Sequence, residues 1–453
     1  MLESSGSGVR FRHELIREVA YETQKRSTLR ENHSLIADRL VEGTRELTPR
    51  IHSECAFHLE RAHRYSEAIA AHLEVAGADQ AVGAHVEVTN RLTHTLELLV
   101  HLGSGTRQQT ELRIRGMRSF SAVMTGGYAA PEAGIDYHES AHLCDALSGA
   151  PEILPSLINS WSYYAMRGDL AQADVVAAAI KNESAKTDPG SPDTASGVSG
   201  FFRGRFAESR QILEAFIETG WGATAERPPP IWPLPNDPLV AVQAHLLLIS
   251  RLTGSAADAR SFADRGRDRA NQLVFPYGPF SVCYLDHFVA MMHSLDGDFV
   301  GVAQVGEELT RLGQRHGFAL WQLVGAEYLA LSAVHLGHHE AVDQLADTLA
   351  MSRAVLVSEV YSPYWLTQLA AAQRIAGRPQ AALSSLDEAL KVASETGSTF
   401  YSAETLRTRG VLRAELGVPG GIGDLQQAIA LAHTQGANAL QERAAASLAE
   451  VSG

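Results

Sequence analysis

Residues 363–397 read PYWLTQLAAAQRIAGRPQAALSSLDEALKVASETG, and this stretch decides the fold. Apolar residues recur at helical spacing before Gly377, at Leu366 and Leu369, and again after it, at Leu386 and Leu390. The Gly-Arg-Pro turn between them suits a helix end followed by a helix start, because glycine tolerates a positive φ and proline fits a first helical turn. The stretch therefore predicts a hairpin of two short helices.

The glycine of this turn recurs along the C-terminal part of the chain. Intervals of 40 residues separate Gly297, Gly337, Gly377 and Gly417. A fixed period of this length is typical of repeat proteins. One hairpin cannot bury its apolar stripe alone, whereas stacked hairpins can. We therefore expect an all-α fold, an α-solenoid in which helix hairpins stack into a superhelical array.

The repeated unit resembles a tetratricopeptide repeat. That family has small residues near the middle of both helices, a glycine at the turn and apolar residues in the second helix, and these positions correspond here to Ala370, Gly377, Ala382, Leu386 and Ala389. The period is longer than the consensus of about 34 residues. We expect the additional residues to lie in longer helices or in the connections between hairpins.

Composition and pattern divide the chain into five segments. Residues 1–8 are rich in serine and glycine and are expected to be disordered, and residues 9–50 are expected to form the helical end of a winged-helix-like region. Residues 51–218 and 239–453 are expected to form two repeat arrays. The intervening residues 219–238, TGWGATAERPPPIWPLPNDP, contain six prolines, which exclude a helix, and enough apolar residues to predict packing along the surface of the solenoid.

The start of the chain contains a spaced phrase that leads into the repeats. An aromatic residue, a histidine, an apolar pair and an Ala-Tyr pair precede a basic residue and a second histidine: Phe11, His13, Leu15, Ile16, Ala20, Tyr21, Arg30 and His33. This phrase resembles the end of the winged-helix region in large bacterial signal-transducing ATPases of the STAND class. Stretches such as NSWSYYAMRGDLAQA and NDPLVAVQAHLLLISRLTG extend the resemblance over nearly the whole chain.

The resemblance implies a regulatory role. Members of that family carry an ATPase module, often with an adenylate/guanylate cyclase domain or a LuxR-type DNA-binding domain. It implies that this chain is the non-catalytic sensor or scaffold region, with an ATPase or cyclase module upstream or in trans. The chain contains no G-x-x-x-x-G-K-[ST] loop, so we expect no ATP binding by that route. The alternative is a gene fragment without an independent role.

Bulk properties exclude several function classes. The 38 Lys and Arg residues against 52 Asp and Glu residues give a net charge of −14, which disfavours direct nucleic-acid binding. The cysteines, Cys55, Cys144 and Cys283, form no metal or disulfide pattern. No apolar run approaches the roughly 20 residues of a membrane span, and the start lacks the apolar core of a signal peptide. We expect a soluble cytoplasmic protein with no cofactor and no membrane contact.

The motif HESAH at residues 138–142 is the sharpest catalytic candidate. His138 and His142 lie one helical turn apart and could bind one zinc ion, with Glu139 as general base, as in zinc metalloproteases. The charge of Asp136 departs from the apolar flank of those enzymes, and no downstream motif offers a third ligand. We therefore expect no catalytic site and no metal, and retain a zinc-dependent hydrolase as the alternative.

The concave face of the array is the candidate binding site. In tetratricopeptide repeats the first helix of each hairpin lines the groove, and its exposed positions contact the ligand. With the glycines as register, aromatic and charged residues at these positions predict a groove for a protein partner or a small-molecule inducer. An ordinary solvated helix face is the alternative. The predicted groove residues are Tyr284, His287, Glu327, Tyr364, Thr367, Arg374, Glu404 and Arg407.

Overall fold

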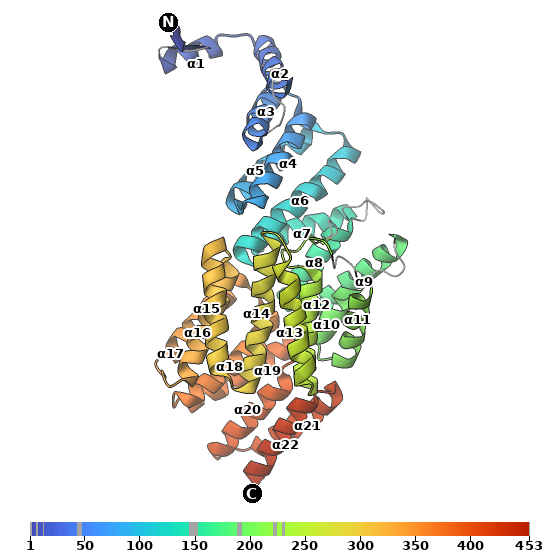
Figure 1. Ribbon diagram of the computed structural model, residues 1–453, viewed down its shortest axis with the longest axis vertical. Helices are drawn as coiled ribbons and strands as arrows, with labels where there is room; N and C mark the ends of the chain where they lie inside the picture. The colour runs from blue at the N-terminus through green and yellow to red at the C-terminus, as the bar shows by residue number, and fades with distance from the viewer. Residues whose placement is uncertain are drawn as a thin grey trace. The chain divides into compact units, whose positions relative to one another are not determined.

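A computed structural model describes residues 2–5, 8–11, 13–42, 48–144, 153–187, 193–220, 224–228 and 232–452 (Figure 1). The chain divides into two compact units, Met1–Met117 and Arg118–Gly453. Almost all described residues are helical, and consecutive helices pack as hairpins. None of the helices in these ranges is both long enough and apolar enough to cross a membrane.

The first unit begins with a short antiparallel strand pair in which Leu2 lies opposite Phe11. These strands occupy most of the segment for which the sequence predicts disorder, so the structure differs from that prediction. Helices follow in the order expected for residues 9–50 and for the start of the first array. The elements are β1 (Leu2–Ser5), β2 (Gly8–Phe11), α1 (Glu14–Glu22), α2 (Arg26–Glu42), α3 (Pro49–Arg61), α4 (Tyr65–Ala81), α5 (His85–Leu98), the 3-10 helix η1 (Leu99–His101) and α6 (Ser104–Gly126), which continues into the second unit.

Two residues of the N-terminal phrase bind each other. The Tyr21 hydroxyl on α1 lies 2.8 Å from Nε2 of His33 on α2, and Nδ1 of His33 lies 2.7 Å from Nδ1 of His58 on α3. Arg61 donates a further hydrogen bond of 3.1 Å to the Tyr21 hydroxyl. The phrase therefore ties the first three helices together. Its origin in a winged-helix region stays a prediction.

The second unit is an α-solenoid of tetratricopeptide-like hairpins, in which each helix packs mainly against its neighbours in sequence. The hairpins around Gly168 and Gly204 and the four regular units all lie where the glycine pattern predicts them. The helices are α7 (Pro131–Cys144), α8 (Ile153–Met166), α9 (Leu170–Thr187), α10 (Thr194–Phe202), α11 (Phe206–Glu218), α12 (Pro238–Thr253), α13 (Ala256–Asn271), α14 (Tyr277–Asp296), α15 (Phe299–His316), α16 (Ala319–His335), α17 (Ala341–Leu356), η2 (Glu359–Tyr361), α18 (Ser362–Ile375), α19 (Pro379–Thr396), α20 (Ser402–Glu415), α21 (Gly421–Gln435) and α22 (Asn438–Ser452).

The repeat glycines have the backbone conformation that the sequence predicts. Gly297, Gly337, Gly377 and Gly417 adopt φ values of 73°, 105°, 71° and 64°, a region in which side chains with a Cβ are strained. The small residues beside the turn of the clearest unit, such as Ala382, are buried where its two helices cross. Hairpin geometry is therefore set locally by the sequence.

The array of the second unit curls back on itself. The backbone amides of Thr399 and Phe400 donate to the carbonyl oxygen of Phe202 at 2.8 and 3.1 Å. The Phe201 and Phe400 rings also pack, with centroids 5.0 Å apart. One apolar cluster consequently extends from Ala122 to Leu440. The inner side of this unit is thus largely filled by core instead of forming an open groove.

The proline-rich segment between α11 and α12 packs into this core, whereas the sequence predicts packing along the solenoid surface. Trp232 and Leu234 are buried, and the Trp232 indole donates to the Asn236 carbonyl oxygen at 2.7 Å. Asp237 caps α12 by accepting from the amides of its first turn and forms a buried ion pair of 2.8 Å with Arg269 on α13. The segment is therefore a structural part of the second unit. Its remaining apolar residues, Trp221 and Ile231, lie outside the described residues.

Candidate functional site

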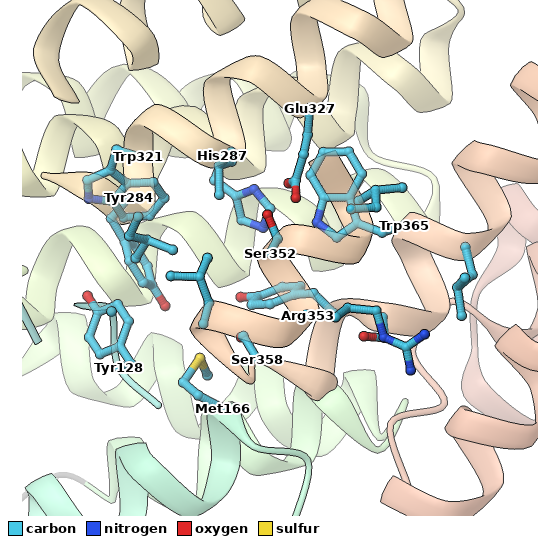
Figure 2. Close-up of a pocket in the computed structure, with 18 residues that line it drawn as sticks. Tyr128, Met166, Tyr284, His287, Trp321, Glu327, Ser352, Arg353, Ser358 and Trp365 are labelled. Atoms are coloured by element: carbon cyan, nitrogen blue, oxygen red, sulfur yellow. The ribbon is translucent and has the colours of Figure 1, made fainter. Parts of the chain in front are cut away.

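A pocket of about 820 Å³, counting the space at its mouth, lies inside the second unit (Figure 2). Its walls come from the first helices of three successive hairpins, α14, α16 and α18, together with α17 and η2. Gly127, Tyr128 and Met166 complete it from earlier hairpins. The remaining lining residues are Tyr284, His287, Leu320, Trp321, Val324, Glu327, Leu349, Ser352, Arg353, Leu356, Ser358, Tyr361, Ser362, Trp365 and Leu366.

The proline-rich segment positions one wall of this pocket. The Tyr128 hydroxyl donates to Oδ1 of Asn236 at 2.5 Å, and the two groups are buried. Tyr128, Met166 and Tyr284 also line a second pocket, of about 440 Å³, beside the first. The insertion that interrupts the repeats therefore holds in place a tyrosine that separates two cavities.

His287 is neutral and its orientation is fixed. The Tyr328 hydroxyl lies 3.0 Å from Nδ1 of His287 and donates to the His287 carbonyl oxygen at 3.1 Å. That hydroxyl has only one proton, so it donates in only one of these contacts, and Nδ1 is the donor to the hydroxyl when the proton goes to the carbonyl oxygen. Burial, with a smaller contribution from His245, lowers the pKa of His287 to about 3. The ring therefore carries no charge at neutral pH.

Glu327 is the acidic group of the pocket. Its side chain comes from the apolar helix α16, is 1% exposed, and points between His287 and Trp365 (Figure 2). Burial raises the pKa of Glu327 to about 8, and the nearby Ser352 hydroxyl offsets only part of this rise. The Ser352 oxygen makes no hydrogen bond of good geometry with any described residue, so the effect of burial dominates. The Glu327 carboxyl is therefore largely protonated at neutral pH.

The cation on the pocket wall is already paired elsewhere. Arg353 donates to both carboxylate oxygens of Glu359, at 3.2 and 3.1 Å, and lies 3.5 Å from Glu388. His287, the other basic residue in the lining, is neutral. Within the described part of the chain, Glu327 therefore forms no ion pair.

The pocket contains three of the predicted groove residues, Tyr284, His287 and Glu327. The sequence predicts them as exposed positions, and this is wrong, because each is less than 10% exposed. These positions are buried because the array curls back and earlier hairpins cover them. Their chemical character and common face are nevertheless as predicted.

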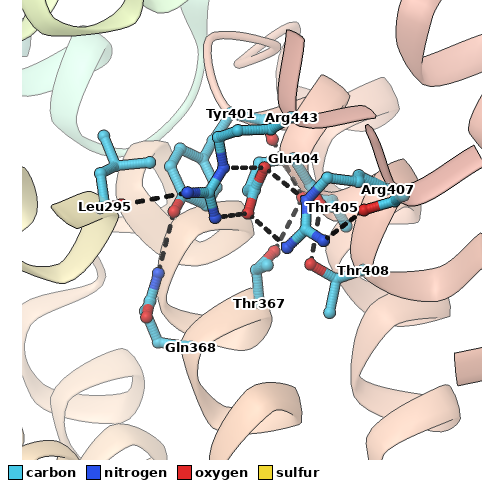
Figure 3. A network of polar contacts seen from close by, with 10 residues as sticks. Leu295, Thr367, Gln368, Tyr401, Glu404, Thr405, Arg407, Thr408 and Arg443 are labelled. Atoms are coloured by element: carbon cyan, nitrogen blue, oxygen red, sulfur yellow. Dashed lines mark hydrogen bonds and ion pairs between the residues drawn. The ribbon is translucent and has the colours of Figure 1, made fainter. Parts of the chain in front are cut away.

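Three further predicted residues belong to a polar network instead of the pocket (Figure 3). Glu404 on α20 accepts from Arg407 at 2.7 and 2.9 Å and from Arg443 on α22 at 2.8 Å. Burial alone would raise the pKa of Glu404, but the two guanidinium groups outweigh it and lower that pKa. The Thr367 hydroxyl lies 2.7 Å from that of Thr405. This network fastens the last helices of the unit to one another.

The last two predicted residues lie apart from the pocket. Tyr364 is fully buried, and its hydroxyl donates to Ser294 Oγ at 3.4 Å. Arg374 is exposed and forms an ion pair with Glu415. The expectation of one continuous exposed groove therefore does not hold for the described residues.

Sequence reasoning missed most of the aromatic wall. Trp321, Tyr361 and Trp365 line the pocket beside the predicted residues. Trp365 is adjacent to the predicted Tyr364, and Trp321 lies six residues before Glu327, so their positions in the first helices were a usable signal. Tyr128 and Met166 had no such signal, since they reach the pocket only through the curling of the array.

The HESAH motif lies on α7. His138 and His142 are exposed, and their Nε2 atoms lie 3.2 Å apart, while Asp136 is buried in a bidentate contact with Arg118. Among the residues that the structure describes, no third His, Cys, Asp or Glu joins the two histidines in a metal-ligating group. Within the described residues, the motif therefore offers two of the three protein ligands of a catalytic zinc site.

A second cluster combines Glu60, His72 and His94 on α3, α4 and α5. Glu60 lies 2.6 Å from Nε2 of His72 and 2.9 Å from Nε2 of His94. Arg91 donates to Nδ1 of His72 at 3.2 Å, which places the ring proton on Nε2, facing Glu60. A metal-bound Nε2 would instead need the proton on Nδ1, so these contacts fit a hydrogen-bonded cluster better than a metal site.

Comparisons with known proteins return only distant resemblances. No protein-family model matches the chain, and no curated protein matches it either. The APC/C hetero-tetramer Cut9–Hcn1 is similar over 94% of this chain and 91% of that chain, with 11% identity and a TM-score of 0.39. A monomeric IFIT1 mutant with Gppp-AAAA is similar over 96% and 97%, with 13% identity and a TM-score of 0.36. Scores this low carry no argument about function.

Proposed function

We propose that this chain is the sensing region of a STAND-type signalling ATPase or transcriptional regulator, and that its pocket receives a small inducer. One observation carries the proposal. The pocket joins α14, α16 and α18 to Tyr128 and Met166 of much earlier hairpins, so a ligand would contact both parts of the curled array. Ligand binding would then favour one packing of the repeats over another, which is the requirement for a regulatory signal.

The mostly apolar lining with a few polar groups is typical of small-molecule sites, which favours a small molecule over a protein segment at this position. A protein partner would use another surface of the array. The family context rests on the N-terminal phrase, in which Tyr21 and His33 bind each other, and on the repeat architecture that follows it.

Blocking the pocket from its mouth tests the proposal. Ser358 lines the pocket and is only half-buried, so Ser358→Trp would fill the cavity with little disturbance of the core. Ser384→Trp, at an exposed position on α19 away from the pocket, is the matched control. Ligands from a small-molecule library that raise the melting temperature of the wild type should lose this effect in Ser358→Trp and keep it in Ser384→Trp.

A ligand at 100 times its dissociation constant stabilises the folded state by about 2.7 kcal/mol, which a melting experiment resolves. Equal stabilisation of the wild type and Ser358→Trp would place the ligand elsewhere and contradict the proposal. The regulatory context is tested separately, by reading the coding sequence that precedes Met1. An in-frame P-loop there, or an adjacent ATPase whose hydrolysis rate responds to the ligand, is the expected result.

A further inference from the structure

The pocket contains an acid that pairs with no cation among the residues that the structure describes. Glu327 is the one acidic residue of helix α16, and it is 1% exposed. An ionised carboxylate in such surroundings needs a cationic partner, because burying an unpaired charge is very unfavourable. Arg353 is held by Glu359 and Glu388, and His287 is neutral. The Glu327 carboxyl therefore either keeps its proton or pairs with a cation that binds in the pocket.

The walls around this carboxyl suit an organic cation. Two indoles, Trp321 and Trp365, have ring centroids 6.5 and 6.3 Å from that of His287, and the Tyr361 ring lies 4.8 Å from it. Aromatic faces attract ammonium groups, and tryptophan attracts them most strongly. When the His287 proton lies on Nδ1, Nε2 is an acceptor for an ammonium N–H. Carboxylate, imidazole and aromatic rings thus line one pocket (Figure 2).

Other ligand classes fit less well. An inorganic cation would need several oxygen ligands, whereas Glu327 is the one carboxylate in the described lining. A polyamine would need further acidic groups along its length. An anion would find no free cation in the described lining, since the guanidinium of Arg353 is already paired with Glu359 and Glu388. A sugar would require many more polar groups than the apolar and aromatic lining provides.

We propose that the pocket binds a monovalent organic ammonium ion with an apolar body, whose ammonium group contacts Glu327 while its body packs against Trp321 and Trp365. This inference rests on the proposed function, because it names the class of inducer that the pocket would receive. The apolar body is needed to fill the remainder of the cavity, which extends to Met166 and Leu320. The affinity then combines a charge-assisted hydrogen bond, aromatic contacts and apolar burial.

Matched pairs of probes separate the charge from the shape. Phenethylammonium and tryptammonium are compared with the alcohols of the same skeletons, 2-phenylethanol and tryptophol, by calorimetric titration of the full chain. The ammonium probes should bind at least about tenfold more tightly than the alcohols, as expected for one charge-assisted hydrogen bond. Glu327→Gln should remove this preference, and Trp365→Leu should lower the affinity for the ammonium probes several-fold. Glu415→Gln, a surface carboxylate paired with Arg374, should behave as the wild type.

The outcomes distinguish the two proposals. Equal affinity for the ammonium and alcohol probes, unchanged in Glu327→Gln, would overturn the ammonium inference and leave the small-molecule site in place. An ammonium preference that persists in Glu327→Gln would also overturn it, since the charge would then be recognised elsewhere. If none of the four probes binds at about 10 mM, each binding free energy is weaker than about 3 kcal/mol, and this result would overturn both proposals.

Discussion

Replacing Glu327 by glutamine should stabilise the folded protein, by an amount that depends on pH. Glutamine keeps the shape of the side chain and removes its charge. The pKa of Glu327 is raised from 4.5 in its ordinary state to about 8 by burial. The folded chain therefore retains a proton that the unfolded chain releases over this range. The stability contributed by this group is fully present below pH 4.5 and is lost as the pH rises through about 8.

The size of the effect follows from the shift. Each pH unit in this window lowers the free energy of unfolding of the wild type by about 1.4 kcal/mol. The wild type therefore loses about 3 kcal/mol of stability by pH 7, whereas position 327 of the glutamine variant contributes no such loss. A unit the size of Arg118–Gly453 has an unfolding entropy of about 0.7 kcal/mol/K. The melting temperature of the variant should therefore rise by about 4 °C relative to that of the wild type between pH 4.5 and 7. Above pH 8 the gain should level off.

Melting curves recorded at several pH values for the wild type, Glu327→Gln and the surface control Glu415→Gln measure this gain. Other groups titrate too, but they cancel in the difference between variant and wild type. The groups near Glu327 keep the same charge between pH 5 and 8. Burial lowers the pKa of His287 to about 3 and raises the pKa of the neighbouring tyrosines, and Arg353 remains paired with Glu359. The neighbouring tyrosines are Tyr328, Tyr361 and Tyr364. A stability difference that does not change with pH would refute the reasoning.

Three further outcomes are expected. Trp232→Ala should lower the free energy of unfolding by about 3–5 kcal/mol in urea titrations, because it leaves a cavity beneath the proline-rich segment. Glu404→Ala should lower that free energy by about 1–3 kcal/mol, since it removes a buried carboxylate that accepts from the partly exposed guanidinium groups of Arg407 and Arg443, whereas the exposed Glu415→Ala should change it by less than about 1 kcal/mol in the same assay. His138→Ala should leave the zinc content of the dialysed protein unchanged in elemental analysis, and loss of one zinc per chain would restore the hydrolase hypothesis.

The hairpin architecture could be predicted because its determinants are local. Gly377 with its positive φ, the following proline and the small residues at the helix crossing all act within one repeat. The proline-rich segment could be placed against the solenoid for a similar reason, since a helix was excluded and Trp232 needed burial. The strand pair near the N-terminus was missed, because serine and glycine carry weak strand signals.

The site could be predicted only in part, because its closure is not local. The repeat register identified Tyr284, His287 and Glu327 on one face, and the structure brings these three together. The contact between Thr399 and Phe202, which closes the array, joins hairpins far apart in sequence and leaves no trace in the 40-residue period. Without that contact the same residues would be exposed groove positions. With it they become the wall of a pocket.

The position of Glu327 supports a binding role independently of the shape of the pocket. A leucine or glutamine at this buried position of α16 would favour the folded state by avoiding the unfavourable ionisation of a buried acid. Residues that reduce stability in this way concentrate at functional sites, where a ligand relieves the unfavourable term. A bound ammonium ion would do so by replacing the proton on Glu327. The same exchange would couple ligand binding to the release of a proton, so an affinity that increases between pH 6 and 8 for ammonium probes, but not for alcohols, would tie the buried acid directly to recognition.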